Sequence, residues 1–129
     1  MKFEPLAQYI EENIVGLKRG TTLFINNMPA TATFGVLLKD SFAGTEIDGD
    51  IPHLRRGRFH LAVRGQDYGA TLALAESVSA LLTITGMDFE GMTVKSIRPI
   101  NEPVPYMPSI GNLVEFSVNF SAVYGIVAE

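Results

Sequence analysis

The chain has no cysteine and no tryptophan among its 129 residues. Without cysteine it has no disulfides, no thiol nucleophile and no zinc site with cysteine ligands, which fits a reducing compartment. No apolar run approaches the roughly 20 residues that cross a bilayer, and the first residues lack the pattern of a secretory signal. We therefore expect a soluble protein with no membrane partner.

Positive charge is also scarce. Ten lysines and arginines stand against fourteen acidic residues, giving a formal net charge of −4, which argues against a broad nucleic-acid-binding surface. Apolar residues make up 47% of the chain, too many for a disordered protein. The length suits one domain spanning residues 1–129.

The clearest structural signal is a strand that runs directly into a helix. In residues 58–64 the apolar side chains occupy every second position, which indicates a half-buried strand. Gly65 then interrupts the pattern, and Asp67 is a good N-cap. Apolar spacing of three and four follows over residues 68–82, which predicts a helix lying on a sheet.

The same patterns predict the other elements. They are a helix at 5–15, strands at 21–26 and 33–38 joined as a hairpin through 27–31, a long loop at 39–57, a helix end near Gly86, a strand at 93–97, an irregular connection at 98–111 and a strand at 113–124. This order predicts an α+β fold, with a single, mostly antiparallel sheet packed by two helices and a long loop between the second and third strands.

The long loop carries acidic residues at alternate positions: Glu46, Asp48 and Asp50. Such a cluster suggests a divalent-metal site, but it lacks the later bidentate glutamate and the spacing of a calcium loop. A solvated acidic loop is the favoured interpretation. We predict no metal and no cofactor.

The chain also lacks a visible catalytic constellation. His53 and His60 are its only histidines, and no serine or acid lies at the spacing of a recognisable triad. A phosphate-binding glycine-rich loop is absent as well. We predict no enzyme; a small hydrolase or ligand-binding pocket using His60, Arg58 and Arg64 is the remote alternative.

One basic cluster precedes and enters the strand at 58–64. Arg55, Arg56 and Arg58 form it together with His53. It could bind nucleic acid or pair with the acidic loop of a neighbouring subunit, and arginine is favoured at protein interfaces. The interface interpretation is favoured, and the candidate interface residues are Arg55, Arg56, Arg58, His60, Arg64, Glu46, Asp48 and Asp50.

Six stretches, in order over most of the chain, carry a resemblance. They are PLAQYIEE from residue 5, TLFINNMP from 22, GVLLKD from 35, GRFHLAVR from 57, the helix at 68–82 and EFSVNFSAVY from 115. Together they resemble the minor capsid proteins of tailed bacteriophages and prophages, and are similar to the tail terminator (head–tail joining) proteins of long-tailed phages.

The resemblance implies a structural protein with no catalytic residues. Such proteins form a ring, usually a homo-hexamer, that ends tail-tube polymerisation and joins tail to head. The implied partners are further copies of the chain, the tail tube protein and a head-completion or connector protein. DNA passes through without sequence readout, and the protein resides in the virion after assembly in the host bacterial cytoplasm. A head-completion adaptor or capsid-associated minor protein is the alternative.

A closed ring of identical subunits needs a heterologous contact. The alanine-rich helix between residues 70 and 80 and an exposed strand edge are candidates for that contact. The loop at 39–57 is a candidate contact with the tail tube.

Overall fold

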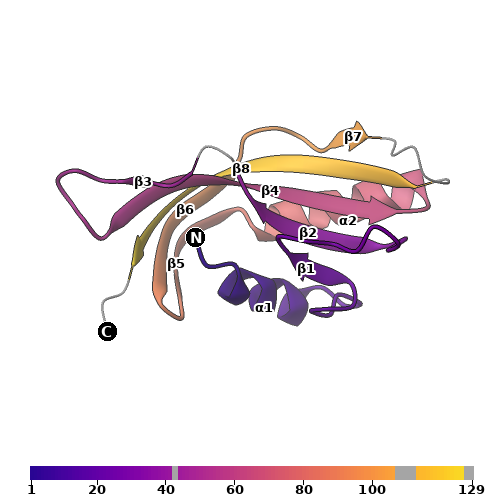
Figure 1. The fold of residues 1–129 in the computed structure, drawn as a ribbon, viewed down its shortest axis with the longest axis horizontal. Coiled ribbons are helices and arrows are strands. Elements are labelled where there is room, and N and C mark those ends of the chain that lie inside the picture. The colour runs from indigo at the N-terminus through magenta and orange to yellow at the C-terminus, as the bar shows by residue number, and fades with distance from the viewer. Residues whose placement is uncertain (42–43, 107–112, 127–129) are drawn as a thin grey trace.

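A computed structural model describes residues 1–41, 44–106 and 113–126, which form two helices and one eight-stranded sheet (Figure 1). The elements in chain order are α1 (Glu4–Asn13), β1 (Leu23–Ile25), β2 (Gly35–Asp40), β3 (Glu46–Ile47), β4 (Leu54–Gly65), α2 (Tyr68–Leu81), β5 (Ile84–Phe89), β6 (Met92–Pro99), β7 (Val104–Tyr106) and β8 (Val114–Ile126). The predicted α+β class, with one mostly antiparallel sheet and two helices, is confirmed.

Two long antiparallel strands form the centre of the sheet. β4 and β8 pair from Leu54 opposite Gly125 to Gly65 opposite Val114. The strand order is β1-β2-β4-β8-β6-β5, with β3 added to β4 and β7 added to β8. Each central strand therefore has one long and one short neighbour on its outer side.

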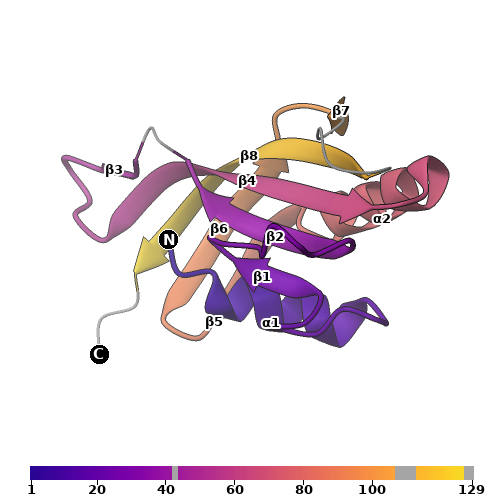
Figure 2. The ribbon, with the colours of Figure 1, turned by 45° about the vertical axis from the view of Figure 1, so that its right-hand side comes forward.

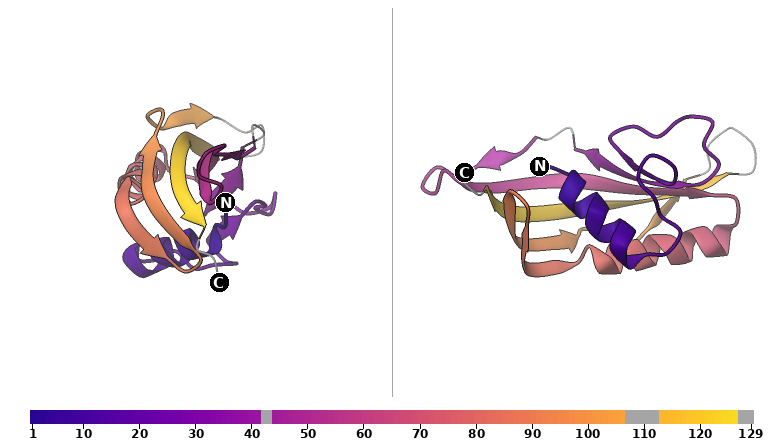
Figure 3. Two further views of the ribbon diagram at one scale, coloured as in Figure 1. Left: turned by 90° about the vertical axis from the view of Figure 1, so that its left-hand side faces the viewer. Right: turned by 90° about the horizontal axis from the view of Figure 1, so that it is seen from below.

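Both helices cover the same face of this curved sheet (Figures 2 and 3). Leu6 and Ile10 of α1 and Val78 of α2 are fully buried in one core with the inward residues of β4 and β8. Phe59 and Phe120 stack across those strands at 5.0 Å between ring centroids. We call the helix-bearing side the covered face and the other side the open face.

The strand-to-helix connection has the predicted form. Alternate residues of β4 are buried, and the Asp67 carboxylate accepts a hydrogen bond from the Ala70 N–H at 2.7 Å, capping α2. Gly65 permits the close approach of this helix, because a Cβ built there would lie 2.2 Å from Thr71 Oγ1. The Thr71 hydroxyl in turn donates to the Asp67 carbonyl at 2.6 Å.

The predicted hairpin at 21–38 is wrong. β1 and β2 are parallel, with Leu23 opposite Val36. Residues 26–34 carry the chain back past the start of β1: Asn26 turns with a φ of 61°, and Met28 is 8% exposed. Parallel pairing requires this longer crossing connection, and the burial of Met28 anchors it.

The predicted loop at 39–57 is only partly correct, because strands occupy both of its ends and a short part of its interior. β2 runs to Asp40, β4 begins at Leu54, and β3 pairs with β4 through Glu46 opposite Arg56. Figure 1 shows this β3–β4 hairpin projecting beyond the helices, so we call residues 44–58 the arm. Because the arm extends beyond the covered core, its strands lack the apolar alternation that would have revealed them.

Two further predictions need correction. α2 ends at Leu81 rather than near Gly86, which lies inside β5 with a φ of 66°. The connection predicted at 98–111 contains the end of β6 and all of β7, although its residues 107–112 lie outside the described part. β5 and β7, two strands that were not predicted, lie at edges of the sheet and are mostly exposed, so their sequences carry little periodicity.

Candidate assembly interface

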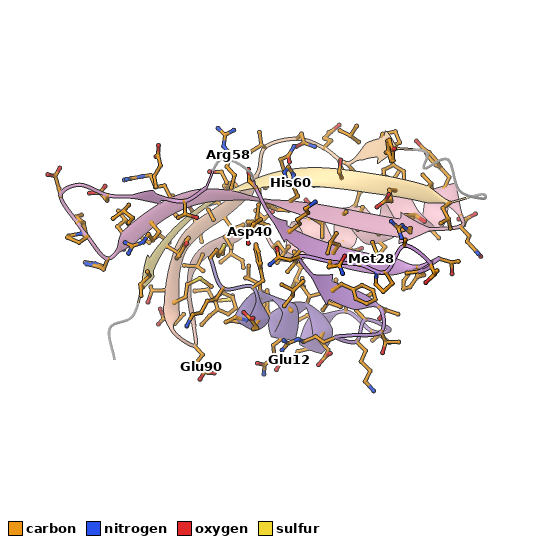
Figure 4. The ribbon with its side chains drawn as sticks, viewed as in Figure 1. Glu12, Met28, Asp40, Arg58, His60 and Glu90 are labelled. Atoms are coloured by element: carbon orange, nitrogen blue, oxygen red, sulfur yellow. The ribbon has the colours of Figure 1, made fainter. Side chains whose placement is uncertain are left out.

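The open face of the sheet carries the polar half of β4 and β8. Residues directly opposite in an antiparallel pair share a face, so Arg58 faces the same side as Ser121, and His60 the same side as Asn119. Lys39 of β2 joins the row of His60. Neither helix covers this side, and Figure 4 shows Arg58 and His60 pointing away from α1.

The acidic residues of the arm do not act as one group. Asp48 accepts hydrogen bonds from the N–H groups of Asp50 and Ile51 at 2.9 and 2.8 Å, and from the Arg56 guanidinium at 2.6 Å. The Arg56 guanidinium, helped by the two N–H groups, lowers the pKa of the Asp48 carboxyl to about 2. Asp48 is therefore a turn-forming anion fixed within the arm.

The other arm residues divide between its sides. Glu46 lies opposite Arg56 in the register and is exposed. The Arg55 guanidinium donates to the carbonyls of Pro52 and Leu54, which places it on the loop that closes the arm. Two large apolar side chains of the arm, Ile47 and Ile51, are also exposed.

Arg64 is held by its own chain. Its guanidinium lies 3.5 Å from the Glu115 carboxylate and donates to the carbonyls of Pro29 and Ala32, and its side chain is only 15% exposed. It fastens the 26–34 connection to the end of β4. Like Asp48, Arg64 is thus a predicted interface residue that is engaged in intramolecular contacts.

Arg58 and His60 are differently placed. Arg58 is exposed and has no ion-pair partner in the described ranges. It lines a depression of about 380 Å³ together with Glu46, Arg56 and Ser121. His60 is half-buried, and its side chain makes no hydrogen bond to a described residue.

The alanine-rich helix presents a small-residue surface outward. Thr71, Ala75 and Val78 of α2 face the sheet, whereas Ala70, Ala73 and Ala80 are exposed. The outer side of α2 also borders a depression of about 430 Å³ against residues 99–103.

Sequence reasoning missed a larger groove on the helix side of the molecule. It lies between α1 and the β5–β6 turn and has a volume of about 600 Å³. Its carboxylates come from two elements distant in sequence, so no local pattern could reveal it. The acidic residues on its walls are Glu4, Glu12, Asp88 and Glu90, and Arg19 is the cation beside them.

Clusters of metal ligands and membrane-spanning helices are both absent from the described residues. No three His, Asp or Glu side chains within residues 1–41, 44–106 and 113–126 converge as metal ligands. No helix in the described part of the chain is long and apolar enough to cross a membrane.

Comparisons with known proteins define the fold relationship. No family model matches the sequence, and no curated protein matches it. Among solved structures, a chain from the virion of a native gene transfer agent (GTA) particle has a similar fold, with a TM-score of 0.62 and 14% sequence identity. The match covers 82% of this chain and 80% of that one. The likeness in fold therefore extends over most of both chains.

Proposed function

We propose that the protein is a structural virion protein of a long-tailed phage or prophage, and that it forms a ring that ends the tail tube and joins it to the head. The observation that carries the proposal is the fold likeness over 82% of the chain to a component of a GTA virion. The ordered resemblance of the sequence to tail terminator proteins agrees with it.

The geometry fits a ring subunit. The open face, the arm and the outer side of α2 provide separate exposed surfaces on different sides of one rigid sheet. A ring subunit needs two different contact surfaces for its neighbours and further ones for the parts above and below it. The arm, with Ile47 and Ile51 exposed at its end, is our candidate for the tail tube contact.

Charge is consistent with a passage for DNA. The net charge of −4 means that a ring of these subunits is negative as a whole. A strongly basic channel would retain DNA through counterion release, whereas a negative one lets it slide. We expect DNA to pass through the ring without sequence readout.

Deletion of the gene from its phage or prophage tests the function. We expect tails of abnormal length and heads without tails in electron micrographs, and restoration by the wild-type gene. Normal tails joined to filled heads would contradict the proposal.

A head-completion adaptor or capsid-associated protein is the second candidate, because the GTA likeness is to a virion component without a stated position. Cross-linking in assembled particles separates the two. Adducts with tail tube protein support the terminator, and adducts with portal or capsid protein alone support the second candidate.

A further inference from the structure

We propose that the open face of the sheet docks into the acidic groove of a second copy of this chain, so that subunits associate head to tail. We define the basic face as Lys39, Arg58 and His60, and the acidic groove as the depression carrying Glu4, Glu12, Asp88 and Glu90. The inference rests on the proposed ring and assigns the contact that builds it.

The basic face has cations that form no ion pair with the described residues. Lys39 and Arg58 are exposed, and neither has an ion pair within the described ranges. The neighbouring cations are already engaged: Arg56 binds Asp48, and Arg98 donates to the Ile84 carbonyl at 2.8 Å. Lys39 and Arg58 are therefore the free positive charges at the centre of this face.

Neutral hydrogen-bonding groups lie beside these cations, and the exposed Glu46 lines the same depression as Arg58. Ser121 lies opposite Arg58, and Asn119 lies opposite His60 on the adjacent strand. Ser121 is exposed, and Asn119 is half-buried. These neutral groups help the face to receive carboxylates, and Glu46 is the like charge at its edge, on the arm.

The acidic groove carries an excess of negative charge, which complements the basic face. Its four carboxylates form no ion pair among the described residues, although Glu12 accepts a hydrogen bond from the Gln8 amide at 3.0 Å. Tyr9 and Phe89 meet edge to face at 5.7 Å on its wall, which provides apolar surface. Mutual repulsion of the carboxylates is relieved when cations enter the groove.

The two surfaces lie on opposite sides of the molecule. Figure 4 shows Arg58 and His60 above the sheet, and Glu12 and Glu90 below it on α1 and the β5–β6 turn. One chain cannot bring them together, but two copies can. A contact between different surfaces of identical chains is heterologous, and repetition of it produces a closed ring or a filament.

A second copy fits the basic face better than duplex DNA does. DNA would engage the basic face and leave the acidic groove unmatched, while a second copy matches both surfaces at once. The net charge of −4 also opposes approach of a polyanion. Binding of duplex DNA to the basic face is therefore the competing result that the experiment must detect.

Paired charge reversal provides the experiment. One variant carries Lys39→Glu and Arg58→Glu, and the other carries Glu12→Lys and Glu90→Lys. Analytical ultracentrifugation of wild type should show assemblies, and each variant alone should associate at least about tenfold more weakly. An equimolar mixture should assemble again, because the acidic face of the first variant then meets the basic groove of the second, and the unaltered pair also remains complementary.

Matched controls reverse charges elsewhere. Lys2→Glu and Lys18→Glu, made singly and together, change exposed residues outside both surfaces and away from the depression on the outer side of α2. These variants should assemble as wild type does. Recovery in the mixture also shows that both reversed chains are folded.

Three outcomes overturn the proposal. If wild type forms rings but the mixture of reversed variants stays dissociated, the contact is wrong and the proposed ring stands. If wild type stays monomeric at its highest soluble concentration, the contact is wrong, and the function is then judged by tail morphology in the gene deletion. If the Lys39→Glu, Arg58→Glu variant assembles normally but loses binding to duplex DNA, the basic face contacts DNA.

Discussion

Alternate residues of β4 and β8 face opposite sides of the sheet, and the two sides have different roles. Phe59 and His60 are neighbours in sequence; the first is 1% exposed under the helices, and the second lies on the open face. The covered face is packed with aromatic and aliphatic side chains. The open face carries charged and amide side chains, and several of them form hydrogen bonds or ion pairs with neighbouring segments of the chain. Stability resides on one side of the sheet and the capacity for association on the other.

The largest expected effect is on the covered face. Phe59→Ala removes a ring that stacks on Phe120 and meets Phe3 edge to face at 5.6 Å. We expect a loss of about 3–5 kcal/mol in the free energy of unfolding, measured by urea denaturation. His60→Ala, one residue away on the open face, should change it by less than about 0.5 kcal/mol. Equal losses would remove the distinction between the faces.

The next largest effect concerns the close packing of α2 against the end of β4. Gly65→Ala places a methyl group against Thr71 Oγ1, which is already committed to the Asp67 carbonyl. We expect a loss of about 1–3 kcal/mol from overpacking. Gly49→Ala is the control, because a Cβ there meets nothing within 4 Å. A Gly65→Ala chain as stable as the Gly49→Ala chain would show that α2 does not need this close approach.

A smaller effect separates two arginines of the open face. Arg64→Ala breaks the contacts with Glu115, Pro29 and Ala32, and should cost about 1–2 kcal/mol in thermal unfolding experiments. Arg58→Ala should leave stability within about 0.5 kcal/mol of wild type and weaken association instead. The reverse pattern would show that the open face is built for stability.

The smallest effect concerns the arm. The pKa of Asp48 is depressed to about 2 in the folded chain from an ordinary value of 3.8, so its stabilising contribution is present above about pH 4. It is lost as the pH falls through about 2. NMR titration of the Asp48 carboxyl should give this low midpoint, and Arg56→Ala should raise it toward 3.8. An unchanged midpoint would mean that the backbone N–H groups alone set it.

The sequence was informative where one face of an element is buried. Three predictions of this kind are confirmed. They are the strand at 58–64 from its alternation, the helix that Asp67 caps, and the long strand at 113–124. The strands of the arm and β5 were not predicted, because they are exposed over most of their length. Local periodicity arises only where one side of an element is buried.

Pairing and surfaces were harder to predict than elements. The parallel pairing of β1 with β2 depends on how residues 26–34 cross the sheet, and the sequence pattern contains no such information. The sequence groups the arginines of the arm, but their individual partners depend on register: Arg55 binds backbone carbonyls and Arg56 binds Asp48. The acidic groove joins α1 to the β5–β6 turn, some eighty residues later, and only the fold reveals it.

The position of β8 has a consequence for how the chain acquires its structure. This last strand lies between β4 and β6, so before it is present the sheet exists only as two unconnected parts. Its partners in β4 are distant in sequence: 49 residues separate Gly65 from Val114, and 71 separate Leu54 from Gly125. Pairing over such separations is slow. β4 and β6 therefore lack their shared neighbour until β8 has been synthesised, and the sheet cannot close across its centre before then.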